Sequence, residues 1–542
     1  MRTSHGRRPA ACGILDSMAN DTRPHPCAAR LRRTAAARTS GVAALVAATL
    51  LASSCTGSAE PDETPVSDPT PTGPGVRSYV STDVVAPELP VTLGPAASSD
   101  TSDDLYVLGP KKDEAVHVGP LLVDATGEPV WISPGRSAGY DVRVQELDGE
   151  PVLTYYEGRA PFVGNGQGSI VVLDTSYQEI ARVTTGDPLE PDHADLHDST
   201  ITPDGTMLLT SYPIVPRDLS ALGGPADGYV FDGVVQEVDV MTGDVVSTWS
   251  ALDHVDLADT FATPEATDDA EATGTQDAPF DWFHVNSAKK LTPDGDVLVS
   301  GRNTHAVYAL DRGTGEVRWT LGGRSSDVEM VGSGPDDEPG TGAQFAWQHD
   351  AQLHEDGTLT VFDNEGDPAV GDHSRGLRLA LETDADGVPT TATVDQEWLP
   401  SDPTLVAGSQ GNVQVLDDGD VVIGWGDAQV FGEYTADGEL VREFPIEAGE
   451  SYRAYRADWH ATPSDPPAVV VEDGTAYVTW NGATDVASWR LVAGDDEASA
   501  TEVATVPRDG FETALAPVPD DAEYVAVEAL AADGAVLGTG TP

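Results

Sequence analysis

The sequence predicts an all-β protein, a six-bladed β-propeller followed by a small β-sandwich of the fibronectin type III or immunoglobulin kind. Three observations predict this fold. From Leu105 onward, short apolar or alternating runs recur between Asp-Gly, Thr-Gly and Pro-Asp-Gly turns, without a long amphipathic helix pattern. These runs group into six similar repeats. After Pro466 the repeats stop, and alternation with a period of two continues.

Residues 1–55 have the features of a lipoprotein export signal. A basic region containing Arg32 and Arg33 precedes an apolar run over 42–51, and the segment ends in Leu-Ala-Ser-Ser-Cys at Cys55. We therefore expect an extracytoplasmic protein of the cell envelope, attached to the membrane only by a lipid on Cys55. The alternative is an ordinary cleaved secretory peptide, and Met18 is an alternative start.

Residues 56–100 are rich in Pro, Thr, Ser, Asp and Gly and lack apolar periodicity, which predicts a disordered linker. The whole chain has 91 acidic and 29 basic residues, a formal net charge of −62. This charge disfavours nucleic acid and anionic membrane surfaces as partners. Acidity of this extent is more typical of a compositional habit than of one cationic partner.

The six repeats predict the propeller between residues 101 and 465. Each has a strand ending in a Pro-Asp-Gly-like turn, an apolar return strand, a strand ending in Asp and an outer strand. The clearest copy is AKKLTPDGDVLVSGRNTHAVYALDRGTGEVRWTLGG, over 288–323. Four short antiparallel strands repeated radially are typical of a propeller. Two β-sandwiches would not explain such regular turn spacing. Residues 466–542 then form the predicted sandwich, for which we expect a packing or spacer role.

Three histidines occur at related positions in consecutive repeats. His197 and His349 each lie seven residues before a turn aspartate, and His284 begins the corresponding strand of the repeat between them. A hairpin over 281–303 would bring His284 close to Arg302. Imidazoles and a guanidinium gathered near the propeller axis suit an oxyanion. Each histidine could instead cap a strand entry, and three imidazoles also suit zinc or copper, but a fixed arginine repels a metal, so we predict no metal.

Several of these segments resemble the arylsulfotransferase family, in the bacterial aryl-sulfate sulfotransferase-like subgroup shared by actinobacterial and fungal sequences. They are FHVNSAKKLTPDGDVLVSGRN, FAWQHDAQLHEDG, SRGLRLAL, GNVQVLDDGDVVIGWG and SYRAYRADW, and the resemblance covers roughly 119–459. It implies a six-bladed propeller and an enzyme that transfers a sulfuryl group from a phenolic sulfate ester to a phenol. No nucleotide sulfate donor or other cofactor is implied.

The resemblance also implies residue roles. His349 matches the nucleophile that becomes sulfurylated, and His284, Arg302 and His197 match supporting catalytic residues. Fixed cations and donors should surround the sulfuryl oxygens; we expect Arg302 and Asn286 to supply them, a second histidine to act as acid and base, and Asp350 to orient His349. The alternatives are a sulfatase and a non-catalytic, lipid-anchored propeller that binds a small ligand or an envelope partner.

Overall fold

The computed structural model describes residues 75–98, 103–112, 116–135, 139–162, 164–267, 271–290, 295–332, 342–366, 368–446 and 449–542. The predicted signal segment and Cys55 lie outside these residues. The chain is all-β, as the sequence predicts, and is built mainly from four-stranded antiparallel sheets. No helix in the described ranges is long and apolar enough to cross a membrane.

Six antiparallel sheets occur within the described part of residues 103–457, and each follows one predicted repeat. The first three consist, from the inner strand outward, of β31 (Glu450–Ala457), β4 (Leu105–Lys111), β5 (Leu121–Val123) and β6 (Pro129–Ile132); of β7 (Tyr140–Leu147), β8 (Glu150–Phe162), β9 (Asn165–Leu173) and β10 (Glu179–Val183); and of β11 (Ser199–Ile201), β12 (Thr206–Ser211), β15 (Val234–Asp239) and β16 (Val245–Ser250).

The other three sheets continue the same pattern along the chain. They consist of β18 (Val285–Lys290), β19 (Val297–Gly301), β20 (Ala306–Leu310) and β21 (Val317–Gly322); of β23 (His349–Leu353), β24 (Thr358–Asp363), β25 (Arg375–Thr383) and β26 (Pro389–Trp398), with β22 (Glu329–Met330) added in parallel; and of β27 (Asn412–Val415), β28 (Val421–Gly424), β29 (Val430–Tyr434) and β30 (Leu440–Pro445), with β3 (Thr92–Leu93) at the edge.

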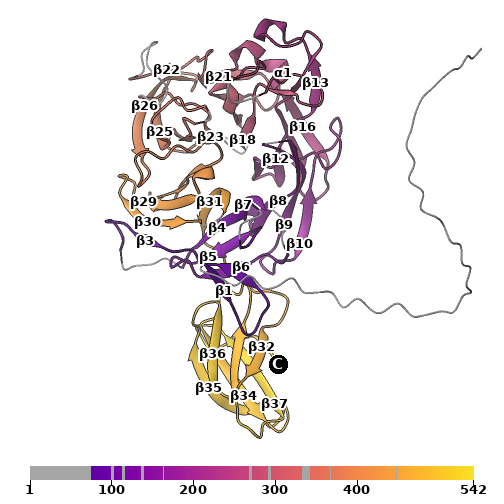
Figure 1. The fold of residues 1–542 in the computed structure, drawn as a ribbon, viewed down its shortest axis with the longest axis vertical. Coiled ribbons are helices and arrows are strands. Elements are labelled where there is room, and N and C mark those ends of the chain that lie inside the picture. Colours follow the sequence, from indigo (N-terminus) through magenta and orange to yellow (C-terminus); the bar gives the residue numbers. More distant parts are fainter. Residues whose placement is uncertain are drawn as a thin grey trace, which may run out of the picture. The chain divides into compact units, whose positions relative to one another are not determined.

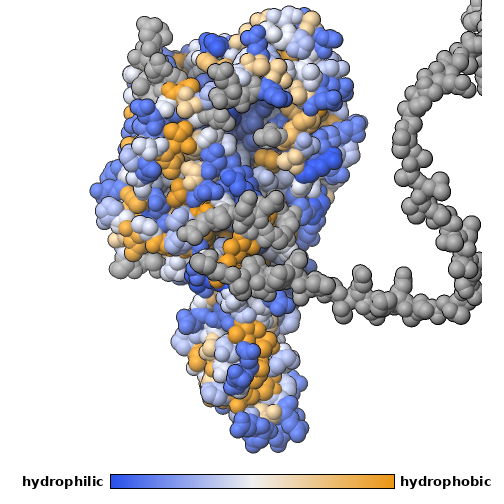
Figure 2. Space-filling view, viewed as in Figure 1, coloured by the Kyte–Doolittle hydropathy of each residue, from blue (hydrophilic) through white to orange (hydrophobic). Residues whose placement is uncertain are grey.

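The inner strands of the six sheets contact one another in a closed ring (Figure 1). Strand β7 contacts β11, and the contacts continue through β18, β23, β27 and β31 back to β7. Because β31 pairs antiparallel with β4, the last strand of the ring completes the first sheet. The sequence repeats did not reveal this closure, since the first repeat supplies only three of its four strands. Figure 2 shows a hollow near the centre of the ring whose visible interior is hydrophilic.

Apolar side chains fill the space between neighbouring sheets. Leu298 and Val307 of the fourth sheet pack in one cluster with Leu359 and Val361 of the fifth, and all four are fully buried. Burying one such side chain contributes about 1.5–3 kcal/mol to stability. Strands β19 and β20 are buried at every position, because each sheet packs against a neighbour on both of its faces.

Residues 75–98 correct the prediction of a disordered linker over 56–100. They form β1 (Val76–Ser78), β2 (Val85–Pro87) and β3, and Thr92 of β3 pairs with Glu443 of β30. The segment is held because an outer strand offers it unpaired backbone groups, which composition does not reveal.

Short elements occupy the connections. Within the third sheet, β12 and β15 are joined through β13 (Ile214–Arg217), η1 (Ser220–Leu222) and β14 (Gly228–Phe231). The third and fourth sheets are joined through α1 (Ala251–His254), η2 (Leu257–Asp259) and β17 (Phe280–Asp281), and single turns occur at η3 (Arg302–Thr304) and η4 (Gly426–Ala428).

Residues 468–540 form two further antiparallel sheets. One contains β32 (Ala468–Glu472), β33 (Thr475–Thr479) and β36 (Glu512–Pro517); the other contains β34 (Ser488–Gly494), β35 (Thr501–Pro507), β37 (Tyr524–Leu530) and β38 (Val536–Gly540). Their buried faces share one hydrophobic core that includes Trp480 and Trp489.

Candidate active site

His349 begins β23 and is 1% exposed. Its Nδ1 lies 2.7 Å from Oδ1 of Asn364, whose amide nitrogen donates to the carbonyls of Ala407 and Gln410 at 3.1 and 3.0 Å. Two carbonyl acceptors fix the orientation of this amide, so its oxygen must accept from His349. Nδ1 therefore carries the proton, and Nε2 of the neutral ring presents a lone pair.

The charge state of His349 follows from its surroundings. Burial, and after it the positive charge of Arg302, lowers the pKa of His349 well below 6.5. Its lone pair on Nε2 currently accepts a hydrogen bond of 3.2 Å from the backbone N–H of Gln410. An incoming electrophile would have to replace that single weak contact. The ring is thus a neutral base held in one tautomer.

His197 and His284 form a pair in direct contact. Their Nε2 atoms lie 3.1 Å apart, and the two rings meet edge to face with centroids 4.8 Å apart. Each Nδ1 contacts a carboxylate: that of His197 lies 2.5 Å from Asp195, and that of His284 is hydrogen bonded to Asp281. Burial lowers the pKa of His284, and Asp281 opposes this shift. The side chain of His284 is 13% exposed and that of His197 4%.

The hairpin formed by β18 and β19 places Arg302 beside His284. The backbone N–H of Arg302 donates to the carbonyl of His284 at 3.0 Å, as the hairpin hypothesis expected. The guanidinium donates to Oδ1 of Asn303 at 2.9 Å and to the carbonyl of Gly408 at 3.0 Å, and its carbon lies 4.9 Å above the ring of Trp347. The cation is therefore held in place by groups from three consecutive sheets.

Asn286 does not occupy the position expected of a sulfuryl ligand. It is fully buried, and its amide nitrogen donates at 2.6 Å to the carbonyl of Gln348, the residue before His349. The side chain of Gln348 in turn donates to Ser300 at 2.9 Å and to the carbonyl of Gly301. Asn286 thus holds the backbone that carries His349.

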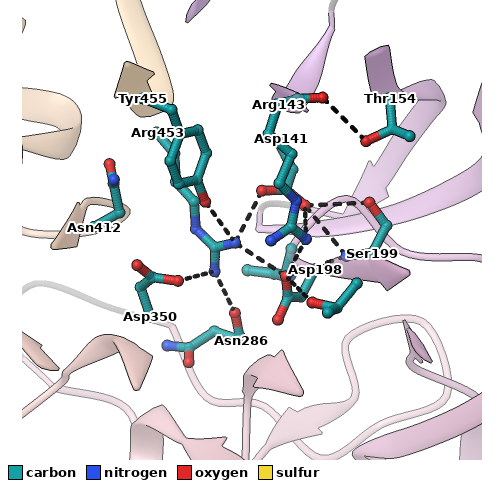
Figure 3. Close-up of polar contacts among 12 residues, drawn as sticks. Asp141, Arg143, Thr154, Asp198, Ser199, Asn286, Asp350, Asn412, Arg453 and Tyr455 are labelled. Atoms are coloured by element: carbon teal, nitrogen blue, oxygen red, sulfur yellow. Dashed lines mark hydrogen bonds and ion pairs between the residues drawn. The ribbon is translucent and has the colours of Figure 1, made fainter. Parts of the chain in front are cut away.

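Asp350 does not orient His349, because Nδ1 of His349 is bonded to Asn364. Asp350 instead lies 3.3 Å from Lys289 and 3.6 Å from Arg453. Arg453 also pairs with Asp141 at 2.8 Å and with Asp198 at 3.0 Å (Figure 3).

We call this group of buried charges the axial network; it comprises Asp141, Arg143, Asp198, Lys289, Asp350 and Arg453. Its members come from five of the six sheets or from the residues that lead into them. Three cations balance three carboxylates, so the network is formally neutral. Asp198 and Asp350 directly follow His197 and His349. The ion pairs of these two aspartates therefore hold the backbone where β11 and β23 begin.

Four residues near the histidines make contacts that the sequence did not predict: Asp195, Asp281, Asn364 and Tyr452. The first two lie two and three positions before a predicted histidine, which was an available signal. Tyr452 on β31 faces both groups, with its ring centroid 5.6 Å from that of His197 and 6.4 Å from that of His349. Within the described residues, its buried hydroxyl has no hydrogen-bond partner. Among those residues, no three or more His, Cys, Asp or Glu side chains are arranged to hold a metal ion.

A model of the arylsulfotransferase (ASST) family matches residues 143–447, more than half of the chain. The chain belongs to the arylsulfotransferase family. The match includes His197, His284, Arg302 and His349, and it ends before β31. Within this arylsulfotransferase-family protein, Tyr452 and Arg453 thus lie beyond the matched segment although they contact its central residues.

Among curated proteins, no sequence matches the chain. Solved structures similar to it include a protein of unknown function from Bacteroides caccae (13% identity, 66% of this chain and 99% of that chain, TM-score 0.36) and a catalytically inactive H270A virginiamycin B lyase from Staphylococcus aureus (12%, 74% and 94%, TM-score 0.29). Hydrazine synthase from Kuenenia stuttgartiensis is another (12%, 77% and 99%, TM-score 0.33). Likeness at this level carries no argument about function.

Proposed function

We propose that the six sheets form a six-bladed β-propeller that acts as an arylsulfotransferase. The reaction moves a sulfuryl group from a phenolic sulfate ester to a second phenol, with no nucleotide sulfate donor. The observation that carries this proposal is the state of His349, a buried neutral imidazole whose tautomer is fixed with the lone pair on Nε2. A neutral imidazole is a good nucleophile that forms an intermediate a phenol can later displace.

In the first half-reaction Nε2 of His349 attacks the sulfur of the donor ester. An N–S bond forms, the S–O bond to the aryl group breaks, and its electron pair leaves on the phenolate oxygen. In the second half-reaction the oxygen of the acceptor attacks the same sulfur, and the N–S bond breaks. Both half-reactions use one nucleophile, so ping-pong kinetics are expected.

Arg302 supports this chemistry as a fixed positive charge. During transfer the three sulfuryl oxygens carry negative charge, and a cation that is already oriented stabilises that charge without reorganisation. The contacts of Arg302 with Trp347 and the carbonyl of Gly408 supply such orientation. We assign proton transfer to the pair His284 and His197, which would protonate the leaving phenolate and deprotonate the acceptor phenol. His284 is the more exposed of the two rings, so we assign to it the direct contact with the phenols.

We also propose an extracytoplasmic location, with a lipid on Cys55. This rests on the basic and apolar pattern of residues 1–55. Globomycin treatment of producing cells tests it, because a lipoprotein precursor accumulates when its signal peptidase is inhibited. Unchanged processing would instead favour an ordinary secretory peptide.

The enzymatic proposal is tested by incubating the protein with 4-nitrophenyl sulfate, with and without a phenol acceptor. We expect nitrophenol release that increases with acceptor concentration, together with a sulfated acceptor detected by mass spectrometry. His349→Ala should abolish both, whereas His460→Ala, a change at a side chain that is 66% exposed, should leave them unchanged.

Two other outcomes identify the alternatives. Nitrophenol release with inorganic sulfate as the product and no sulfated acceptor would show a sulfatase. Binding of phenols without release from any aryl sulfate would show a non-catalytic binding protein, and would contradict the proposal.

A further inference from the structure

The contact between His197 and His284 constrains how many protons the two rings hold. Each Nδ1 faces a carboxylate oxygen, and the two Nε2 atoms face each other at 3.1 Å. If both rings were neutral with the proton on Nδ1, two lone pairs would oppose each other. Satisfying all three contacts therefore requires three protons, one in each. The group Asp195, His197, His284 and Asp281 then has a net charge of −1, one proton more than two neutral imidazoles with two carboxylates would hold.

From this geometry we infer that the four residues act as one proton-holding unit, in which Asp195 and Asp281 are positioning residues that keep a transferable proton between the two histidines. The inference rests on the proposed arylsulfotransferase activity and adds two residues to its machinery. Neither aspartate was predicted as part of the site.

The surroundings of the pair support this assignment. The charged or titratable groups that face it, besides the two carboxylates, are Arg302, His349, Tyr212 and Tyr452. Burial raises the pKa of both tyrosines well above 10, so both are neutral. Burial lowers the pKa of His284 most, Asp281 opposes this shift, and Arg302 adds a smaller lowering. The contact of each Nδ1 with a carboxylate is therefore what holds a proton in the pair against burial and the arginine.

The proton balance of the reaction then closes within the unit. As the S–O bond of the donor breaks, the departing phenolate oxygen takes the proton from Nε2 of His284, and the unit falls from three protons to two. When the acceptor phenol attacks the sulfur on His349, its hydroxyl proton passes to the vacated position between the rings. The unit returns to three protons, and no outside acid or base is consumed.

The test compares two donors that differ in the acidity of the leaving phenol. An acidic nitrophenol leaves without protonation, whereas 4-methylphenol needs a proton. In a single turnover we expect Asp281→Asn and Asp195→Asn to lower the rate of phenol release from 4-methylphenyl sulfate by about 100-fold or more and from 4-nitrophenyl sulfate by less than about fivefold. The matched control is Asp485→Asn, which alters an exposed carboxylate that bonds Nδ1 of His460 at 2.6 Å, and it should change neither rate.

The pH profile gives a second readout that a merely structural role would not move. The protonated pair is required with 4-methylphenyl sulfate, so the rate should fall as the pH rises through the pKa of the pair. Removing the charge of Asp281 disfavours the proton, lowers that pKa and moves the fall to lower pH. Equal losses with both donors, or an unmoved profile, would overturn the inference.

A spectroscopic measurement keeps the inference independent of activity. In the full-length protein with 15N-labelled histidine, we expect His197 and His284 to share a third proton at neutral pH, and Asp281→Asn to remove it. Two rings with bare Nε2 atoms would contradict the inference even if transfer occurs. Absence of any turnover together with the shared proton would contradict the proposed function and leave the proton-holding unit supported.

Discussion

The two histidine environments at the centre of the ring differ in the partner of Nδ1. His349 is held by the amide of Asn364, whereas His197 and His284 are each held by a carboxylate. An amide oxygen accepts a hydrogen bond without adding charge, so the ring it holds stays neutral and keeps its lone pair. A carboxylate stabilises the imidazolium, so it favours a proton on the ring it holds. Partner chemistry thus distinguishes the proposed nucleophile from the proposed proton carriers.

The same sequence pattern occurs in both environments. His197 and His349 are each followed by aspartate and lie equally far from their turns. Their partners come from different places, because Asp195 lies two residues before His197 and Asn364 lies on the connection after the neighbouring strand β24. Repeats that are equivalent in fold therefore need not be equivalent in chemistry.

The largest expected effect separates the two environments by labelling. With 35S-labelled 4-nitrophenyl sulfate and rapid quenching, His284→Gln should still acquire an acid-labile label on His349, because the acidic nitrophenol leaves unaided. His349→Gln should acquire none, and its turnover should fall by roughly 10³-fold or more. A label on His197 or His284 in either variant would reverse the assignment of roles.

The next largest effect acts on both environments together. Arg453→Met would leave Asp141, Asp198 and Asp350 with one buried cation fewer, which should lower the free energy of unfolding by about 3–5 kcal/mol in urea titrations. Arg182→Met is the matched control, since Arg182 pairs with Glu157 at the surface and its loss should cost about 1 kcal/mol or less. Equal costs would show that the axial network does not anchor the strand entries.

A smaller effect follows from exchanging the partner type. Asn364→Asp would place a carboxylate beside Nδ1 of His349 and raise the pKa of the ring. Because the neutral ring is the reactive form, activity should fall at low pH and recover as the pH rises. Below the raised pKa of His349, the loss should be about tenfold for each pH unit. The carboxylate would also face two carbonyls, so the melting temperature should be measured alongside. An unchanged acid limb in a folded variant would show that the partner does not set the charge of His349.

The smallest effect concerns another buried histidine, His305. His305 stacks on Phe261 with centroids 4.1 Å apart, and burial lowers its pKa to about 3. It is therefore neutral at every working pH. His305→Asn, which suits the left-handed backbone at φ 50°, should leave the pH profile unchanged and cost about 1 kcal/mol of stability through the lost stacking. A displaced profile would add His305 to the titrating groups.

The sequence was sufficient to predict the repeats, and through them the gathering of His197, His284, Arg302 and His349. It could not predict the partner of His349, because the adjacent Asp350 points away and the true partner lies fifteen residues on. It also could not predict where β31 pairs, because that strand completes a sheet whose other members lie more than 300 residues earlier. Pairing across such a distance leaves no local pattern.

The closure of the ring by β31 has a consequence for the order in which the protein matures. Tyr452 and Arg453 lie on the strand that is synthesised last among those of the ring, and both contact the central residues. The site is therefore incomplete until β31 has paired with β4, the strand near the start of the ring's sequence. Such long-range pairing is slow. A truncated or partly synthesised chain would thus lack the reactive centre even where every histidine was already present.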